Sequence, residues 1–279
     1  MVQDVIKWTP MIHLLYLKFY GEPNYNSTLF LSEFLGPLYI GIISLFAFAK
    51  RQLLLKESIL EIRTFKYPLF SIGVALVMIS MMIIFTMNVM LPIFLQGALK
   101  ATTFISAMIL LPATLTNGIV TLITGKIYDK LGTKILIPTG FIIMTVSLFI
   151  LSRSTINTSF VKIIIIYMAV CIGVGSTMTP AQTNSLNQLP KEYYPYGVAI
   201  LNTLQQLSAA IGSALFISIM SALQQRALNN LSTSQQTAVA TGFSTAVLAL
   251  TGVALIGICL SFALRFRNKR FHLSSGLNK

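Results

Sequence analysis

The chain has 279 residues, of which 55% are apolar and only 10% are charged, and its formal net charge is +13. Soluble domains usually have about 25% charged residues, so this composition excludes an ordinary soluble protein. The basic residues lie between apolar runs and at the C-terminal end, not on one amphipathic surface, so we expect no nucleic-acid partner.

The N-terminal segment, residues 1–28, is mixed in character and lacks the apolar core of a signal peptide. Its apolar stretch Met11–Tyr20 is too short to cross a bilayer, so we expect an outer or interfacial segment. The run Leu29–Ala49 predicts an extra transmembrane helix. A basic linker follows at residues 50–67, and its mixture of leucine, isoleucine and charge predicts an amphipathic helix on the inner membrane surface.

Six further apolar runs lie within residues 68–266, and each is long enough, or nearly so, to cross a hydrocarbon core about 30 Å thick. We therefore predict an all-α polytopic membrane protein with about seven transmembrane helices, one extra helix and then a six-helix bundle. A basic inner tail, residues 267–279, follows the bundle. The six runs are Leu69–Leu95, Thr103–Thr124, Ile135–Ser152, Lys162–Thr183, Val198–Met220 and Gly242–Leu264.

The segment Gly125–Lys134 concentrates charge and glycine between two of these runs. A turn this short predicts that the two helices are antiparallel neighbours. Gly125 would end the first helix or admit a close neighbour. Asp129 would cap the next helix or lie near the positive end of its dipole, and Gly132 permits a left-handed turn residue. The positive charges are Lys126, Lys130 and Lys134. A generic basic inner loop is the alternative interpretation.

Uncharged amides inside the apolar runs are the best site candidates, because each needs a hydrogen-bond partner where water is scarce. Helical spacing places Asn88 and Gln96 on one face and Asn202 and Gln206 on another, which predicts a polar substrate cavity. Helix–helix packing is the alternative for any single amide. The candidates are Asn88, Gln96, Asn117, Gln182, Asn202, Gln205 and Gln206. Pro92, Pro112 and Pro180 are expected to kink their helices.

The chemistry of a catalytic or metal site is not visible in the sequence. Cys171 and Cys259 lie inside apolar runs without metal-ligand spacing, and the two histidines, His13 and His272, are isolated. No carboxylate lies deep in an apolar run. We therefore expect a protein that is not an enzyme and that needs no metal or other cofactor.

The basic residues divide unevenly between the two sides of the predicted membrane. Fourteen lie on the side that holds the C-terminus and the segment Gly125–Lys134, and six lie on the other side. The positive-inside rule then predicts a multi-pass protein of the cell membrane with a cytoplasmic C-terminus and an outer N-terminus.

The spacing Gly-x-x-x-Asp-[Arg/Lys]-x-Gly-x-[Arg/Lys] resembles the loop signature of the major facilitator superfamily. Gly125, Asp129, Lys130, Gly132 and Lys134 fill its positions, although members more often have Arg where this chain has Lys130. Other stretches look like the C-terminal half of the fourteen-span drug–proton antiporter (multidrug efflux) branch. They are Pro92–Gln96, Leu110–Ala113, and Asn202–Gln206 with Gly212.

The resemblance implies a membrane transporter, or the C-terminal part of one, that exports small amphipathic compounds or drugs in exchange for protons. Its partners would be the lipid bilayer, the substrate and protons. A full transporter of this class has two six-span bundles around a midplane site, and the family's proton-linked acidic residues belong to the first bundle. The resemblance therefore also implies a missing N-terminal half or a second subunit. A non-functional or regulatory truncated half-transporter is the alternative, and a seven-helix receptor is a less favoured one.

Overall fold

The computed structural model describes residue 43, residues 62–229 and residues 234–276; of residues 62, 63, 129–131, 134 and 265–276 it describes the backbone alone. The predicted N-terminal segment, the extra helix apart from residue 43, and most of the predicted linker lie outside the described residues. The chain divides into two compact units, residues 1–58 and 59–279, and the helices from η1 to α8 belong to the second.

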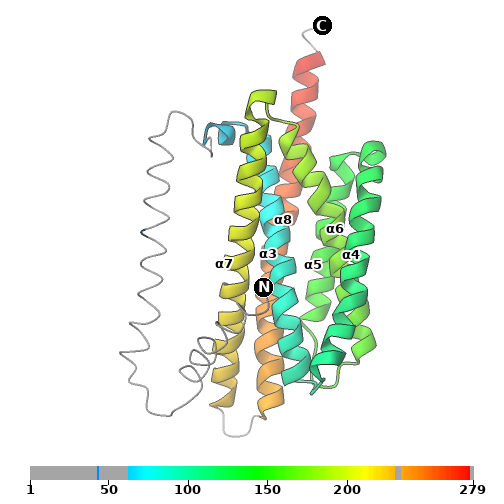
Figure 1. Ribbon diagram of the computed structural model, residues 1–279, viewed down its shortest axis with the longest axis vertical. Coiled ribbons are helices and arrows are strands. Elements are labelled where there is room, and N and C mark those ends of the chain that lie inside the picture. The colour runs from blue at the N-terminus through cyan, green and yellow to red at the C-terminus, as the bar shows by residue number, and fades with distance from the viewer. Residues whose placement is uncertain (1–42, 44–61, 230–233, 277–279) are drawn as a thin grey trace, which may run out of the picture. The chain divides into compact units, whose positions relative to one another are not determined.

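All regular structure in the described ranges is helical, and Figure 1 shows the long helices running side by side. The elements are η1 (Ile62–Lys66), α3 (Pro68–Gly97), α4 (Thr103–Leu131), α5 (Thr133–Leu151), α6 (Phe160–Leu186), η2 (Lys191–Tyr193), α7 (Tyr194–Leu228) and α8 (Gln235–Gly276). Five of these helices are long and apolar enough to cross a membrane, and α5 has a shorter apolar stretch, Ile135–Leu151. The structure confirms an all-α polytopic membrane protein.

Local sequence explains several helix ends. Pro68 occupies the first turn of α3, where its fixed φ suits the helix and its missing N–H has no partner to lose. The Thr102 side chain accepts a hydrogen bond from the Ile105 amide at 3.3 Å and so caps α4. The last helix is longer than its apolar run, because α8 continues to Gly276. The predicted basic tail is therefore, up to that residue, an extension of α8.

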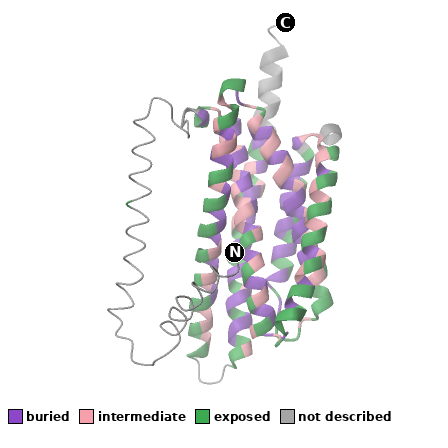
Figure 2. Cartoon of the chain, viewed as in Figure 1, coloured by how far each residue is buried: buried purple, intermediate pink, exposed green. Residues whose placement is uncertain are grey.

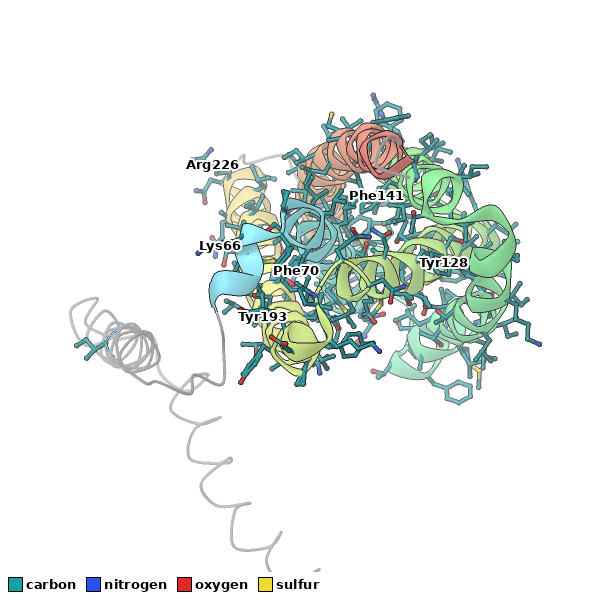
Figure 3. All side chains as sticks on the ribbon, turned by 90° about the horizontal axis from the view of Figure 1, so that it is seen from above. Lys66, Phe70, Tyr128, Phe141, Tyr193 and Arg226 are labelled. Carbon is teal, nitrogen blue, oxygen red and sulfur yellow. The ribbon has the colours of Figure 1, made fainter. Side chains whose placement is uncertain are left out.

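The six long helices form two layers (Figure 3). Helices α7, α3, α6 and α4 pack in this order as a row, and α8 and α5 pack against each other and cover one face of it. The central helices α3 and α6 therefore have neighbours on three sides. No other described helix covers the opposite face of the row, which we call the uncovered face.

Large apolar side chains fill the space between the two layers. Phe94 of α3 stacks on Phe243 of α8 with ring centroids 4.3 Å apart, and both rings are buried. Glycines set the closest approach: a Cβ added to Gly173 of α6 would lie 2.7 Å from the carbonyl oxygen of Gly140 in α5. Figure 2 shows buried residues concentrated where helices meet and exposed residues along the outer faces.

Candidate functional site

The segment Gly125–Lys134 is a helix junction with a single non-helical residue. Helix α4 continues to Leu131, α5 begins at Thr133, and only Gly132 lies between them. Gly132 has φ 67° and ψ 176°, a conformation that glycine alone adopts readily. Its amide donates to the Tyr128 carbonyl at 2.9 Å. The left-handed turn expected at Gly132 is present, but the turn is much shorter than expected.

The expected role of Gly125 is wrong. The helix runs through this residue, and a Cβ added there would meet nothing within 4 Å, so Gly125 neither ends α4 nor admits a close neighbour in the described structure. A mid-helix glycine costs only about 1 kcal/mol relative to alanine, whereas an interrupted helix in lipid leaves several backbone groups unpaired. The helix therefore continues.

Two further expectations about this junction are corrected. Gly132 holds the N-cap position of α5, so Asp129, in the last turn of α4, does not occupy that position. Helices α4 and α5 are also not close packing neighbours, because each contacts α6 far more extensively than it contacts the other. The reason lies on α6, where Gly173 faces α5 and Gly175 faces α4, so that both helices approach the same helix closely.

Asn88 and Asn117, two of the candidate amides, link helices. The Tyr167 hydroxyl of α6 donates to Asn88 Oδ1 of α3 at 2.7 Å, and Asn117 Nδ2 of α4 donates to the Cys171 carbonyl of α6 at 3.2 Å. Tyr167 is fully buried, and both asparagines are half-buried. Tyr167 is not predicted from the sequence, since the spacing of residues within one helix does not indicate which residue of another helix lies opposite.

The other candidate amides lie in different surroundings. Gln96 is exposed at the end of α3 and accepts from the Thr103 hydroxyl at 3.4 Å. Asn202 and Gln206 are exposed on α7, whereas Gln205 is buried. Gln182 of α6 is half-buried. The hydrogen bonds described for these amides do not join any two of them, so the shared cavity stays a prediction.

The three prolines predicted to kink their helices lie within α3, α4 and α6, and each helix continues past its proline. Pro92 removes the amide that would bond to the Asn88 carbonyl, and Pro180 does the same for Ser176. Both freed carbonyls belong to the central helices of the row. A fourth proline inside a helix, Pro138 of α5, was not among the candidates.

The uncovered face is mostly apolar along α3. On α3, Phe85, Val89 and Ile93 are 42%, 42% and 39% exposed, and their spacing makes one continuous stripe. Since α7, α6 and α8 cover the other sides of α3, this stripe points away from the covered layer. Asn88 lies beside the stripe, and Gln96 extends it.

The exposed side of α6 changes character along the helix. Val161 and Ile165 are exposed near its start, and the small hydroxyl residues Ser176, Thr179 and Thr183 are half-buried further along. Ser176 borders Gly140 of α5, so this side of α6 lies next to the covering helix α5 and not beside the stripe of α3. The sequence alone does not single out these residues, because an apolar or hydroxyl stripe in a membrane helix resembles a lipid-facing or packing surface. The described residues of the α3 stripe and of this side of α6 include no acidic or basic side chain beyond the helix ends. Such a face suits a ligand that is largely apolar and forms a few hydrogen bonds.

The described residues hold no group of three or more His, Cys, Asp or Glu side chains that could bind a metal ion. The carboxylates of the described part of the chain are Asp129, in the last turn of α4, and Glu192, in η2. Neither lies in the middle of a membrane helix.

Comparison with known proteins gives a consistent set of relatives. The lincomycin resistance protein LmrB of Bacillus subtilis (strain 168) is 41% identical over 233 residues, which cover 82% of this chain and 49% of the relative. LmrB of Listeria monocytogenes is 42% identical over 205 residues, covering 74% of this chain and 43% of the relative. The uncharacterised transporter YcnB of Bacillus subtilis is 31% identical over 234 residues, covering 84% and 49%.

The chain therefore spans about half the length of these relatives. The sequence profile of the Major Facilitator Superfamily matches residues 14–213, which is more than half of the chain. The six-helix bundle and the segment Gly125–Lys134 agree with this match, and the chain belongs to the Major Facilitator Superfamily of membrane transporters.

Proposed function

We propose that this chain forms one six-helix half of a transporter that exports small amphipathic compounds or drugs in exchange for protons. The observation that carries the proposal is the uncovered face: the central membrane helix α3 exposes a continuous stripe of apolar side chains, with Asn88 beside it, in a row covered on its other side by α5 and α8. The names of the LmrB relatives support drugs, lincomycin among them, as the first substrates to test.

The side chains of the uncovered face fit a substrate of mixed polarity. Phe85, Val89 and Ile93 would supply apolar contact. Asn88 would supply a hydrogen bond, which fixes orientation. The Tyr167 hydroxyl engages Asn88 Oδ1, so the amide nitrogen of Asn88 is the group that would meet an acceptor oxygen of the substrate. Asn202, Gln206, Asn117 and Gln182 remain candidate members of the wider cavity.

A second six-helix half would complete the transporter. Alternating access needs two bundles that rock about a site between them, and the described bundle supplies one wall. The described membrane helices have no carboxylate at midplane depth, so the group that binds the exchanged proton would come from the other half. That half would be an N-terminal part of the same protein or a second subunit, in a cell membrane with the C-terminus of this chain in the cytoplasm.

The test uses bacteria that lack their own drug pumps. They express this chain alone, this chain with the N-terminal half of LmrB from Bacillus subtilis, or that half alone, and radiolabelled lincomycin accumulation is measured with and without a protonophore. We expect protonophore-sensitive efflux from the pair and from neither part alone. Efflux by this chain as a demonstrated monomer would refute the need for a second half. The absence of efflux from every combination with well-expressed chains would favour a non-functional or regulatory half-transporter.

Two substitutions test whether the substrate passes along the uncovered face. Val89→Trp places a bulky ring on the uncovered face of α3. Leu122→Trp is its matched control, because Leu122 of α4 is 75% exposed within an apolar stripe suited to lipid. We expect Val89→Trp to abolish efflux by the pair and Leu122→Trp to preserve it. The reverse result would move the path away from the uncovered face.

A further inference from the structure

One end of the described bundle is rich in basic residues. The ends of α4 and α8 and the starts of α3, α5 and α7 meet at this end, at the top of Figure 1. In the described chain, ten basic residues lie at this end against two acidic ones, and four basic residues lie at the opposite end. The ten are Arg63, Lys66, Lys126, Lys130, Lys134, Lys191, Arg265, Arg267, Lys269 and Arg270; the two are Asp129 and Glu192; the four are Lys100, Arg153, Lys162 and Arg226.

The densest group of these basic residues begins at the depth of the lipid headgroups. The apolar run of α8, Gly242–Leu264, has 23 residues. At 1.5 Å per residue it is about 35 Å long, slightly more than a hydrocarbon core about 30 Å thick. Arg265 is the next residue, and three more basic residues follow within one and a half turns while the helix continues to Gly276. These basic residues of α8 therefore begin where the helix passes from the hydrocarbon core into the headgroup layer.

A second group of these basic residues lies on η1 and η2. The Tyr67 and Tyr193 rings pack with centroids 6.3 Å apart, which joins the start of α3 to the start of α7. Lys66 precedes one ring, Lys191 precedes the other by two residues, and both lysines are exposed. Figure 3 shows Lys66 and Tyr193 on these neighbouring elements. Tyrosines with adjacent lysines are typical of the membrane–water boundary.

We propose that this end of the bundle binds anionic phospholipid headgroups, with the extension of α8 and the Lys66–Lys191 pair as its two contact areas. A layer of headgroups can meet both contact areas, because their basic residues directly precede or follow membrane helices at the same end of the bundle. Each basic residue near an anionic membrane surface raises the affinity about fivefold. The inference does not depend on transport or on which leaflet this end faces.

The experiment measures lipid selectivity of the purified full chain. The chain is placed in nanodiscs of phosphatidylcholine that contain a minor fraction of phosphatidylglycerol, and spin-labelled analogues of each lipid report which one is immobilised at the protein. We expect a preference for phosphatidylglycerol of about fivefold or more, which weakens as salt is added. Equal immobilisation of the two lipids would overturn the proposal.

Charge-matched variants locate the surface. Arg265→Gln/Arg267→Gln/Lys269→Gln/Arg270→Gln should lose most of the preference, and Lys66→Gln/Lys191→Gln should lose part of it. The control Lys100→Gln/Arg153→Gln/Lys162→Gln/Arg226→Gln removes the same charge from the opposite end and should keep it. The two-lysine variant tests the proposal if the α8 variant does not fold. Equal losses in the α8 variant and its control would overturn it.

Two competition arms exclude other anions. Inorganic phosphate at moderate concentration should not reduce the preference beyond the effect of sodium chloride at equal ionic strength. A short DNA duplex should bind less tightly than the anionic nanodisc and be displaced by it. Specific competition by phosphate, or DNA binding that anionic lipid does not reverse, would replace the lipid surface with a phosphate or nucleic-acid site.

Discussion

Asn88 stabilises a helix contact and is also a candidate to bind the substrate. Its Oδ1 accepts the hydrogen bond of a buried tyrosine, which stabilises the contact of α3 with α6, while the residue itself is half-buried beside the uncovered face. A second polar contact joins the same two helices, where the Ser80 and Thr177 hydroxyls lie 3.2 Å apart in a buried position. Buried polar groups in a membrane protein need such partners.

Removal of the Tyr167 hydroxyl tests this link. We expect Tyr167→Phe to lower the unfolding free energy of the detergent-purified chain by about 1 kcal/mol, the usual range for hydrogen bonds between membrane helices. Added to Asn88→Leu, the same change should have little further effect, because its partner is already absent. Tyr194→Phe, at an exposed tyrosine, is the control and should change nothing. Additive effects of Tyr167→Phe and Asn88→Leu would contradict the link.

We predict opposite effects on stability for substitutions of Gly132 and Gly125, although both residues belong to the family signature. Gly132→Ala forces a side chain into φ 67° and should cost about 1–3 kcal/mol of stability. Gly125→Ala lies inside α4 with open space around it and should leave the thermal stability of the purified chain unchanged or slightly raised. Differential scanning fluorimetry in one detergent compares the two. Equal destabilisation by the two substitutions would show that Gly125 packs against a neighbour that is not among the described residues.

At the scale of helices, the sequence predicts what depends on length and composition. All six apolar runs of the described region are helices. In lipid, a single segment can pair its backbone N–H and C=O groups within itself only as a helix. Their ends are predicted less well. The predicted run is Val198–Met220, whereas helix α7 begins at Tyr194 and ends at Leu228. Tyrosines and glutamines continue a helix into the membrane boundary as readily as apolar residues do.

The sequence does not predict which residues of different helices contact each other. The short junction at Gly132 predicts packed neighbours, yet α6 separates most of α4 from α5 because its glycines accept both. The amides are correctly identified as polar groups that need partners, but Tyr167 and the Cys171 carbonyl come from another helix. Spacing along one helix contains no information about these partners. The stripe Phe85–Val89–Ile93 becomes a site candidate only when the covered sides of α3 are known.

Gly173 tests the close approach of α5 and α6. A Cβ there would lie 2.7 Å from the Gly140 carbonyl oxygen and 3.0 Å from the Met144 amide nitrogen, and neither backbone atom can turn aside. We expect Gly173→Ala to lower the stability by about 1–3 kcal/mol, as overpacking usually does. Gly252→Ala is the matched control, because that position on α8 is exposed with no atom within 4 Å. A tolerated Gly173→Ala would mean that the two helices lie further apart.

For the whole molecule, the charge asymmetry predicts the orientation in the membrane. Asn157→Cys, in the exposed turn between α5 and α6, should react with a membrane-impermeant maleimide added to intact cells, and Lys191→Cys, exposed on η2, should react only after lysis. Both are made in a Cys259→Ser background, since Cys259 is exposed whereas Cys171 is buried. Labelling of Lys191→Cys from outside would invert the orientation.

The exposed amides of α7 give a test of the proposed second half that does not require a known substrate. Asn202 and Gln206 lie one turn apart on the outside of the described bundle, where an amide that faces hydrocarbon is costly. If a second half covers them, Asn202→Leu/Gln206→Leu should raise the thermal stability of this chain alone and weaken its co-purification with the N-terminal half of LmrB. Ile211→Ala, at an exposed apolar position of the same helix, is the control and should leave co-purification unchanged. Loss of stability in the isolated double variant would instead place both amides in contacts within this chain.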